Sequence, residues 1–127
     1  MTAPGPGESF SVAARARSFT HAFRGVGLLV AGEHNTWIHV VATVGVAAAG
    51  LVLGVTRVEW ALLALAIGLV WSAEAFNTAV ERVADVASPE PDPRIGQAKD
   101  VAAAGVQLAA GAAVVVGLVV FLPRMIG

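Results

Sequence analysis

Residues 101–122 read VAAAGVQLAAGAAVVVGLVVFL and contain no charged side chain. A helix rises about 1.5 Å per residue, so about 20 apolar residues are enough to cross the roughly 30 Å hydrocarbon core of a bilayer. This stretch meets that requirement. It predicts a transmembrane helix over 97–122 and makes the chain an integral membrane protein.

Two further segments toward the amino end can also span a bilayer. Residues 36–56 are apolar, with His39 as their only ionisable side chain. Residues 60–73 are apolar but short, and the same pattern continues past Glu74 to Val86. One long helix over 58–87 is therefore predicted. The three prolines in residues 88–93 indicate a loop before the last span.

The composition of the whole chain agrees with this assignment. The chain has 127 residues, of which 57% are hydrophobic and 13% are charged. Soluble domains are about one quarter charged. A net charge of −1 excludes a basic surface for nucleic acid, and the lack of cysteine excludes disulfides and a thiol nucleophile. We expect an all-α fold with a single membrane domain over 9–127.

The amino-terminal part differs from the spans. Residues 1–8 are rich in proline and glycine and are predicted to be disordered. Residues 9–32 alternate aromatic and aliphatic side chains with Arg15, Arg17 and Arg24. This pattern predicts an amphipathic helix on the membrane surface. The arginines follow a Pro/Gly-rich start without a short apolar run and cleavage site, so no signal peptide is predicted.

The positive charges predict the orientation of the spans. Six of the eight precede the first span or flank the second loop, namely Arg15, Arg17, Arg24, Arg82, Arg94 and Lys99. Because lysine and arginine favour the cytoplasmic side, we expect the amino end and the second loop in the cytoplasm, in a bacterial inner membrane. Small residues recur every four positions at Gly105, Ala109, Ala113 and Gly117, where helices can approach closely. Three spans enclose little interior, which favours a homo-oligomer.

Four polar side chains share one face of the second span. At about 100° per residue, Glu74, Asn77, Glu81 and Asp85 fall within about 80° of one another. An ionised carboxylate at membrane depth costs at least about 2.5 kcal/mol, so Glu74 needs a reason to be there. It is a proton acceptor, a magnesium ligand together with Glu81, or a structural polar contact between helices.

Other polar residues are weaker indications. Glu33 precedes the first span, and Lys99 and Asp100 open the third helix. His39 is expected to be an ordinary interfacial histidine. The chain has no G-x-x-x-x-G-K motif, so any phosphoryl transfer would depend on carboxylate-bound magnesium and positioning.

These segments resemble the prokaryotic diacylglycerol kinase family, small three-span membrane lipid kinases. The resemblance covers residues 19–122. It is carried by Glu74-Ala-Phe-Asn77-Thr-Ala-Val-Glu81, by Asp85, by Ala98-Lys99-Asp100 and by Glu33 before the first span. It implies a homotrimer that phosphorylates a membrane lipid alcohol with Mg-ATP at the cytoplasmic interface.

The resemblance also implies roles for single residues. Glu74 corresponds to the general base, and Glu33 and Glu81 correspond to magnesium ligands. The implied nucleotide contacts are Asn77, Glu90, Lys99, Asp100 and Arg17.

The substrate branch follows from further short segments. Trp37-Ile38-His39, Val58-Glu59-Trp60 and Asp100-Val-Ala-Ala resemble the undecaprenol kinase branch more than the diacylglycerol branch. Undecaprenol is therefore the expected substrate, with diacylglycerol as the alternative. A proton-translocating membrane protein and a non-enzymatic membrane subunit are the competing hypotheses. The first fits less well because the acids gather toward one interface, and the second leaves the alignment of Glu74, Asn77 and Glu81 unexplained.

Overall fold

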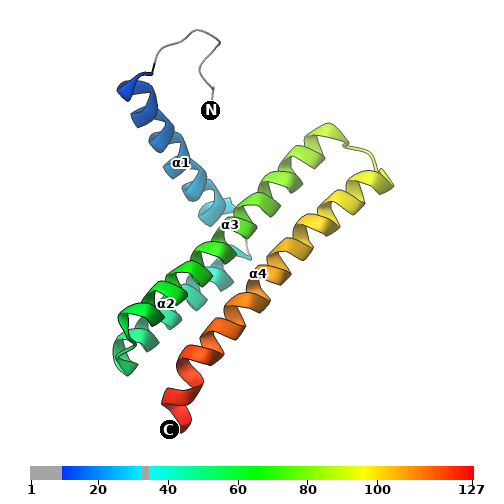
Figure 1. Ribbon diagram of the computed structural model, residues 1–127. Helices are drawn as coiled ribbons and strands as arrows, with labels where there is room; N and C mark the ends of the chain where they lie inside the picture. The colour runs from blue at the N-terminus through cyan, green and yellow to red at the C-terminus, as the bar shows by residue number, and fades with distance from the viewer. Residues whose placement is uncertain (1–9, 33–34) are drawn as a thin grey trace. The chain divides into compact units, whose positions relative to one another are not determined.

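The computed structural model describes residues 10–32 and 35–127. The expectation of disorder for residues 1–8 and the role of Glu33 lie outside the described residues. The described chain forms four helices, α1 (Val12–Gly32), α2 (Thr36–Leu53), α3 (Arg57–Ala87) and α4 (Pro93–Ile126), with no strand among them (Figure 1). The expected all-α class is confirmed. α1 belongs to one compact unit, and α2, α3 and α4 form a second.

α1 carries exposed apolar side chains at helical spacing. Phe19, Phe23 and Val26 lie at positions i, i+4 and i+7, so they form one stripe, and all three are exposed. The guanidinium of Arg15 lies 5.5 Å from the centre of the Phe10 ring. The helix is therefore amphipathic in its side-chain pattern, and its placement on a membrane surface stays a prediction.

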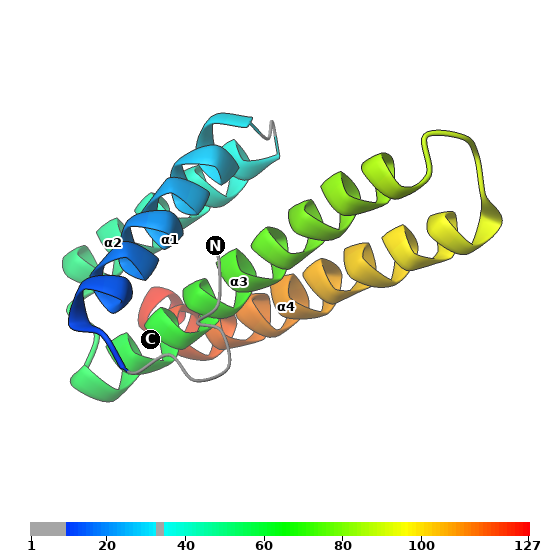
Figure 2. The same cartoon turned by 90° about the horizontal axis from the view of Figure 1, so that it is seen from above.

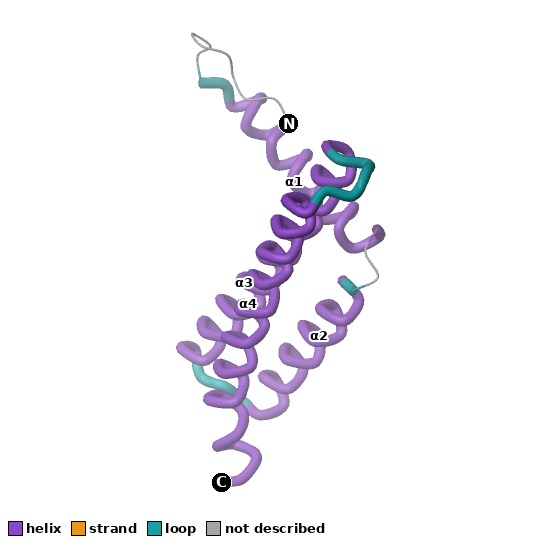
Figure 3. The backbone as a smooth tube through the Cα atoms, turned by 90° about the vertical axis from the view of Figure 1, so that its right-hand side faces the viewer, coloured by secondary structure: helices purple, strands orange, loops and turns teal. Residues whose placement is uncertain are grey.

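The second unit is built on two long antiparallel helices. α3 and α4 run side by side, and the shorter α2 contacts α3 (Figures 1 and 2). Short connections join α2 to α3 and α3 to α4 (Figure 3). All three helices are long and apolar enough to cross a membrane. The three predicted spans are thus confirmed as helices of the required length and composition.

A tight turn joins α2 to α3. Gly54 ends α2 with φ 66°, a left-handed conformation that favours glycine. Thr56 then begins α3 with a capping box, in which its hydroxyl accepts from the Glu59 backbone and the Glu59 carboxylate accepts from the Thr56 backbone. Glu59 also accepts a hydrogen bond from Arg124 near the end of α4. These contacts tie the three helices together at one end.

The interior is small and the outer surface is apolar. Val55, Leu63 and Val120 form the buried cluster, and Trp60 and Phe121 pack against it. Most of the other large apolar side chains of α2, α3 and α4 are exposed, among them Val44, Leu65, Leu108 and Val119. Such a surface would promote aggregation in water and suits helices that face lipid.

The α3–α4 connection ends in a well-defined helix cap. The Asp92 carboxylate accepts a hydrogen bond from the Arg94 backbone at 2.9 Å and from the Arg94 guanidinium, also at 2.9 Å. These bonds lower the pKa of Asp92, and the bond from the Arg94 side chain has the larger effect. Pro93 occupies the first turn, where its fixed φ suits a helix. α4 therefore begins at Pro93, and the expected span 97–122 lies within it.

Candidate functional site

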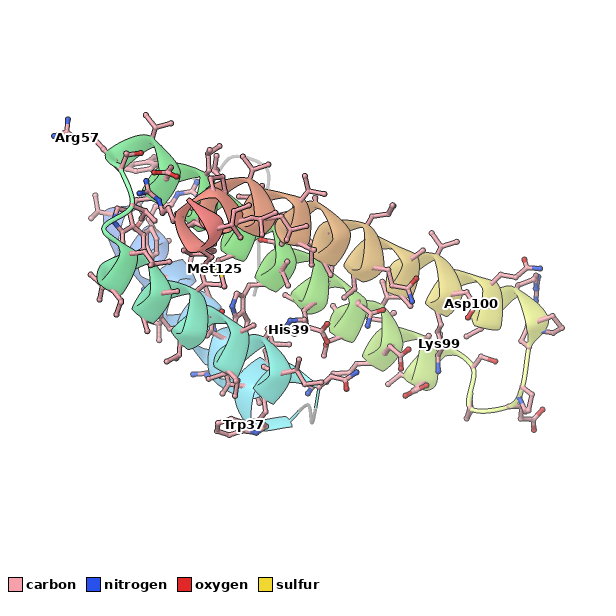
Figure 4. The ribbon with its side chains drawn as sticks, turned by 90° about the horizontal axis from the view of Figure 1, so that it is seen from below. Trp37, His39, Arg57, Lys99, Asp100 and Met125 are labelled. Atoms are coloured by element: carbon pink, nitrogen blue, oxygen red, sulfur yellow. The ribbon has the colours of Figure 1, made fainter. Side chains whose placement is uncertain are left out.

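The site is centred on Glu74, an acid buried within the second unit, which is formed by α2, α3 and α4. Glu74 is only 5% exposed, although it is a carboxylate. Its Oε2 atom lies 3.3 Å from Nε2 of His39 on α2. Figure 4 shows His39 in the space between α2 and α3. A buried acid is normally paired, and this pair links two helices through residues that are 35 positions apart in sequence.

The sequence of α3 explains why Glu74 points inward. Leu63, Ala66, Glu74 and Thr78 are all buried and recur at spacings of three, eight and four residues. These spacings keep the side chains on one face of a helix. The inward face of α3 is thus apolar in its first half, carries the polar side chains of Glu74 and Thr78 in its second half, and is apolar again at Ala84.

A second polar contact lies one turn from the Glu74–His39 pair. The indole Nε1 of Trp71 on α3 donates to Oγ1 of Thr43 on α2 at 2.9 Å. The Thr43 hydroxyl donates in turn to the backbone carbonyl of His39 at 2.7 Å. The His39 and Trp71 rings lie 6.1 Å apart at 59°, within the range of tilted aromatic pairs.

Asn77 lies one turn further along α3, on the side of α4. It lines an open groove of about 710 Å³ between the two helices, together with Ala73, Phe76, Val80 and Ala102 among others. Its Oδ1 atom is buried and has no hydrogen-bond partner among the described residues. An orphaned buried acceptor is uncommon and points to a missing donor.

A second hollow, of about 510 Å³, lies at the α3–α4 connection. It is lined by Asp85, Glu90 and Lys99 together with residues of the loop. Lys99 Nζ lies 2.6 Å from Asp85 Oδ1. The structure therefore brings together two of the predicted nucleotide contacts, Glu90 and Lys99, with Asp85 beside them.

The remaining predicted residues do not line either hollow. Glu81 is exposed and lies two turns, about 10 Å, beyond Glu74 along α3, where its charge acts on Lys99. Asp100 is exposed, and it projects from a different side of α4 than Lys99 (Figure 4). Arg17 is exposed on α1, which belongs to the other unit.

A magnesium site in a protein is built from oxygen ligands, chiefly carboxylates. Within 10–32 and 35–127, no three His, Asp or Glu side chains converge on a common point. Glu81 and Asp85 lie one turn apart on the same face of α3 and offer the hard oxygen ligands that magnesium prefers. Because magnesium is commonly held by one or two carboxylates plus substrate phosphates, these two acids fit the ion when a nucleotide is present.

His39 is a partner of Glu74 that the sequence pattern did not predict. It is the only ionisable residue of its span, and that isolation in an apolar segment was the signal available. Which residue of α3 lies opposite His39 depends on how far α2 is shifted along α3. Neither segment's sequence alone determines that shift.

The sequence matches one protein family and two named kinases. The model of the prokaryotic diacylglycerol kinase family matches residues 20–121. A protein named undecaprenol kinase from Bacillus subtilis is 34% identical over 109 residues, which are 86% of this chain and 89% of that protein. A diacylglycerol kinase from Synechocystis sp. is 38% identical over 110 residues, which are 86% of this chain and 63% of that protein. No solved structure matches the chain.

The family match covers most of the chain, including α2, α3 and nearly all of α4. It also includes Glu74, Asn77, Glu81 and Lys99. The chain therefore belongs to the prokaryotic diacylglycerol kinase family of lipid kinases.

Proposed function

We propose that the protein transfers the γ-phosphate of ATP to undecaprenol and forms undecaprenyl phosphate. The similarity to a protein named undecaprenol kinase, over 89% of that protein's length, supports the substrate. The single structural observation that carries the chemistry is the buried carboxylate of Glu74 in the middle of an apolar helix.

Glu74 acts as the general base in this proposal. A lipid alcohol is a poor nucleophile, and loss of its proton during attack strengthens it. Glu74 accepts the hydroxyl proton while the lipid oxygen forms a bond to the γ-phosphorus and the bond from that phosphorus to the oxygen of ADP breaks. The contact with His39 uses Oε2 and leaves Oε1 for the hydroxyl. The polyprenyl chain stays in the bilayer, so only its hydroxyl end needs to reach the base.

The nucleotide binds toward the α3–α4 connection. Lys99 and Glu90 border the hollow there and meet the phosphates and the nucleoside, respectively. Asn77, Asp100 and Arg17 supply further nucleotide contacts by their correspondence to the family pattern. Glu81 and Glu33 would hold a magnesium ion by their correspondence to the family pattern, with Asp85 one turn beyond Glu81 as a further oxygen ligand, and the ion would offset charge on the phosphates.

The proposal also covers the assembly and its membrane. The sides of α2, α3 and α4 expose many large apolar residues, and Gly105 and Gly117 give α4 places for close helix contact. We infer a homotrimer in the bacterial inner membrane, with α1 on the cytoplasmic surface and the active site at the cytoplasmic interface. The positive charges beside the second loop support this orientation.

The decisive experiment gives the purified protein γ-labelled ATP and magnesium in mixed micelles. Undecaprenol and diacylglycerol are supplied in parallel, and the labelled lipid products are separated. We expect label in undecaprenyl phosphate, with diacylglycerol a poorer substrate. Preferential labelling of phosphatidic acid would replace undecaprenol by diacylglycerol, and no labelled lipid in either arm would refute the proposal.

A further inference from the structure

We propose that His39 is a positioning residue for Glu74, held in place by Trp71 and Thr43. This inference deepens the proposed function and depends on Glu74 acting as its base. His39 touches neither the lipid hydroxyl nor the nucleotide in this scheme. It acts through the carboxylate by fixing which oxygen faces the substrate.

The geometry of the pair restricts the Glu74 carboxylate. Nε2 of His39 is 3.3 Å from Oε2 of Glu74, and the two side chains are only 17% and 7% exposed. An ionised carboxylate only accepts hydrogen bonds, so the contact places the hydrogen on Nε2. With Oε2 engaged, the rotation of the carboxylate is restricted and Oε1 is presented in one direction.

His39 is itself fixed by its neighbours. Trp71 lies one turn before Glu74 on α3, and its indole donates to the Thr43 hydroxyl at 2.9 Å. Thr43 lies one turn after His39 on α2 and donates to the His39 carbonyl at 2.7 Å. The Trp71–Thr43 bond and the His39–Glu74 contact thus link α2 to α3 on successive turns, and the Trp71 ring lies 6.1 Å from the His39 ring. The Trp71–Thr43 bond keeps α2 in the register that places His39 opposite Glu74.

Stability alone explains these polar groups poorly. Thr43, Trp71 and His39 face each other in an otherwise apolar part of α2 and α3. Polar pairs between membrane helices stabilise the fold only modestly. A base must be held within a fraction of an ångström of its productive position, and a shift of about 1 Å can cost about 100-fold in rate. Precise placement of Glu74 therefore accounts better for the arrangement.

The test compares two replacements of His39. His39→Gln retains an N–H donor, because the glutamine amide nitrogen lies the same number of bonds from the backbone as Nε2, whereas His39→Leu has no donor. We expect His39→Leu to lower kcat for the lipid roughly 10-fold or more, with the KM for ATP unchanged. His39→Gln should recover most of kcat. Thr43→Val should lower kcat in part, whereas the matched Thr43→Ser keeps the hydroxyl and should not.

A spectroscopic measurement tests the contact without relying on activity. Protein with isotope-labelled histidine, reconstituted in bilayers, is compared with its Glu74→Gln variant by NMR. The ring nitrogen resonances lost in His39→Gln identify His39. We expect Glu74→Gln to shift these resonances and to leave those of His21, which is exposed on α1, in place.

The outcomes separate the two proposals. Wild-type protein that phosphorylates neither lipid refutes the proposed function, whereas the NMR shift still supports the His39–Glu74 contact. An active wild type with His39→Leu of equal kcat overturns the positioning role. Equal losses in His39→Gln and His39→Leu overturn it as well, because the donor then makes no difference. Unmoved His39 resonances in Glu74→Gln overturn the contact itself.

Discussion

The ammonium of Lys99 on α4 lies 2.6 Å from the Asp85 carboxylate on α3, and both residues of this ion pair line the hollow at the α3–α4 connection. The Asp85 side chain is 67% exposed and that of Lys99 is 30% exposed. Pairs this open to solvent are screened and add little to stability. A phosphate can therefore replace the carboxylate as the partner of Lys99 at little cost to the fold.

The charge of Lys99 is predicted to hold ATP. Replacing Lys99 by Met should raise the KM for ATP roughly 10-fold or more, since a charged hydrogen bond to phosphate is lost. Lys99→Arg keeps the charge and should raise the KM for ATP less. Asp85→Asn should leave Tm close to that of the wild type. Titration with a non-hydrolysable ATP analogue measures the effect. Wild-type affinity in Lys99→Met would remove the lysine from the nucleotide site.

The carboxylate of Glu74 is predicted to be needed for the chemical step and not for nucleotide binding. Glu74→Gln keeps the shape and polarity of the side chain but cannot accept a proton from the lipid. We expect kcat to fall by about 100- to 10,000-fold, the usual range for a general base, with binding of the ATP analogue unchanged. Lipid phosphorylation and analogue binding are measured on the same preparation. Substantial activity in Glu74→Gln would exclude Glu74 as the base.

Glu74 and Lys99 also indicate how far the fold and the site could be predicted from the sequence. Length and hydropathy predicted three spans, because a bilayer imposes its thickness on every helix that crosses it. The place of Glu74 within an apolar helix marked it as a functional candidate, but the sequence left open whether it faces protein or water. The pairing of Glu74 with His39 did not follow, because it depends on how α2 and α3 are aligned. The pairing of Lys99 with Asp85, 14 residues earlier, likewise depends on how the loop aligns α3 with α4.

Glu81 is predicted to be a magnesium ligand. Glu81→Gln should raise the magnesium concentration needed for half-maximal activity, since an amide oxygen is a weaker ligand than a carboxylate. Glu59→Gln is the matched control, because Glu59 lies at the other end of α3, in the capping box with Thr56. Its magnesium dependence should equal that of the wild type. Equal magnesium dependence of the Glu81 and Glu59 variants would contradict the assignment.

The Asp92 cap at the start of α4 is predicted to make stability depend on pH. Hydrogen bonds from the Arg94 side chain and, to a lesser extent, from its backbone lower the pKa of Asp92 below its usual value of about 3.9. The folded pKa is the lower one, so this stabilisation is complete above the unfolded pKa and is lost as pH falls through the folded pKa. Asp92→Asn keeps a capping oxygen but removes the charge. The difference in Tm between wild type and Asp92→Asn should shrink on acidification below about pH 4. A Tm difference that stays constant with pH would show that the charge of Asp92 does not contribute to stability.

The close approach of α2 and α3 is predicted to depend on Gly50. A Cβ atom placed on Gly50 would lie 2.5 Å from Cη2 of the Trp60 ring and 2.9 Å from Cζ2. Real Cβ atoms do not approach this closely, so the ring must shift within the cluster that it packs against. Gly50→Ala should therefore lower the free energy of unfolding by about 1–3 kcal/mol, the usual cost of overpacking.

Gly45 in the same helix supplies the control for Gly50. A Cβ atom there would meet nothing within 4 Å, so Gly45→Ala should be neutral or stabilising by up to about 1 kcal/mol. Unfolding in detergent gives both values. Combining Gly50→Ala with Trp60→Leu removes the ring that clashes. The double variant should therefore lose less free energy of unfolding than the sum of the losses in the two single variants. If Gly50→Ala is as stable as Gly45→Ala, the ring does not limit how closely α2 and α3 pack.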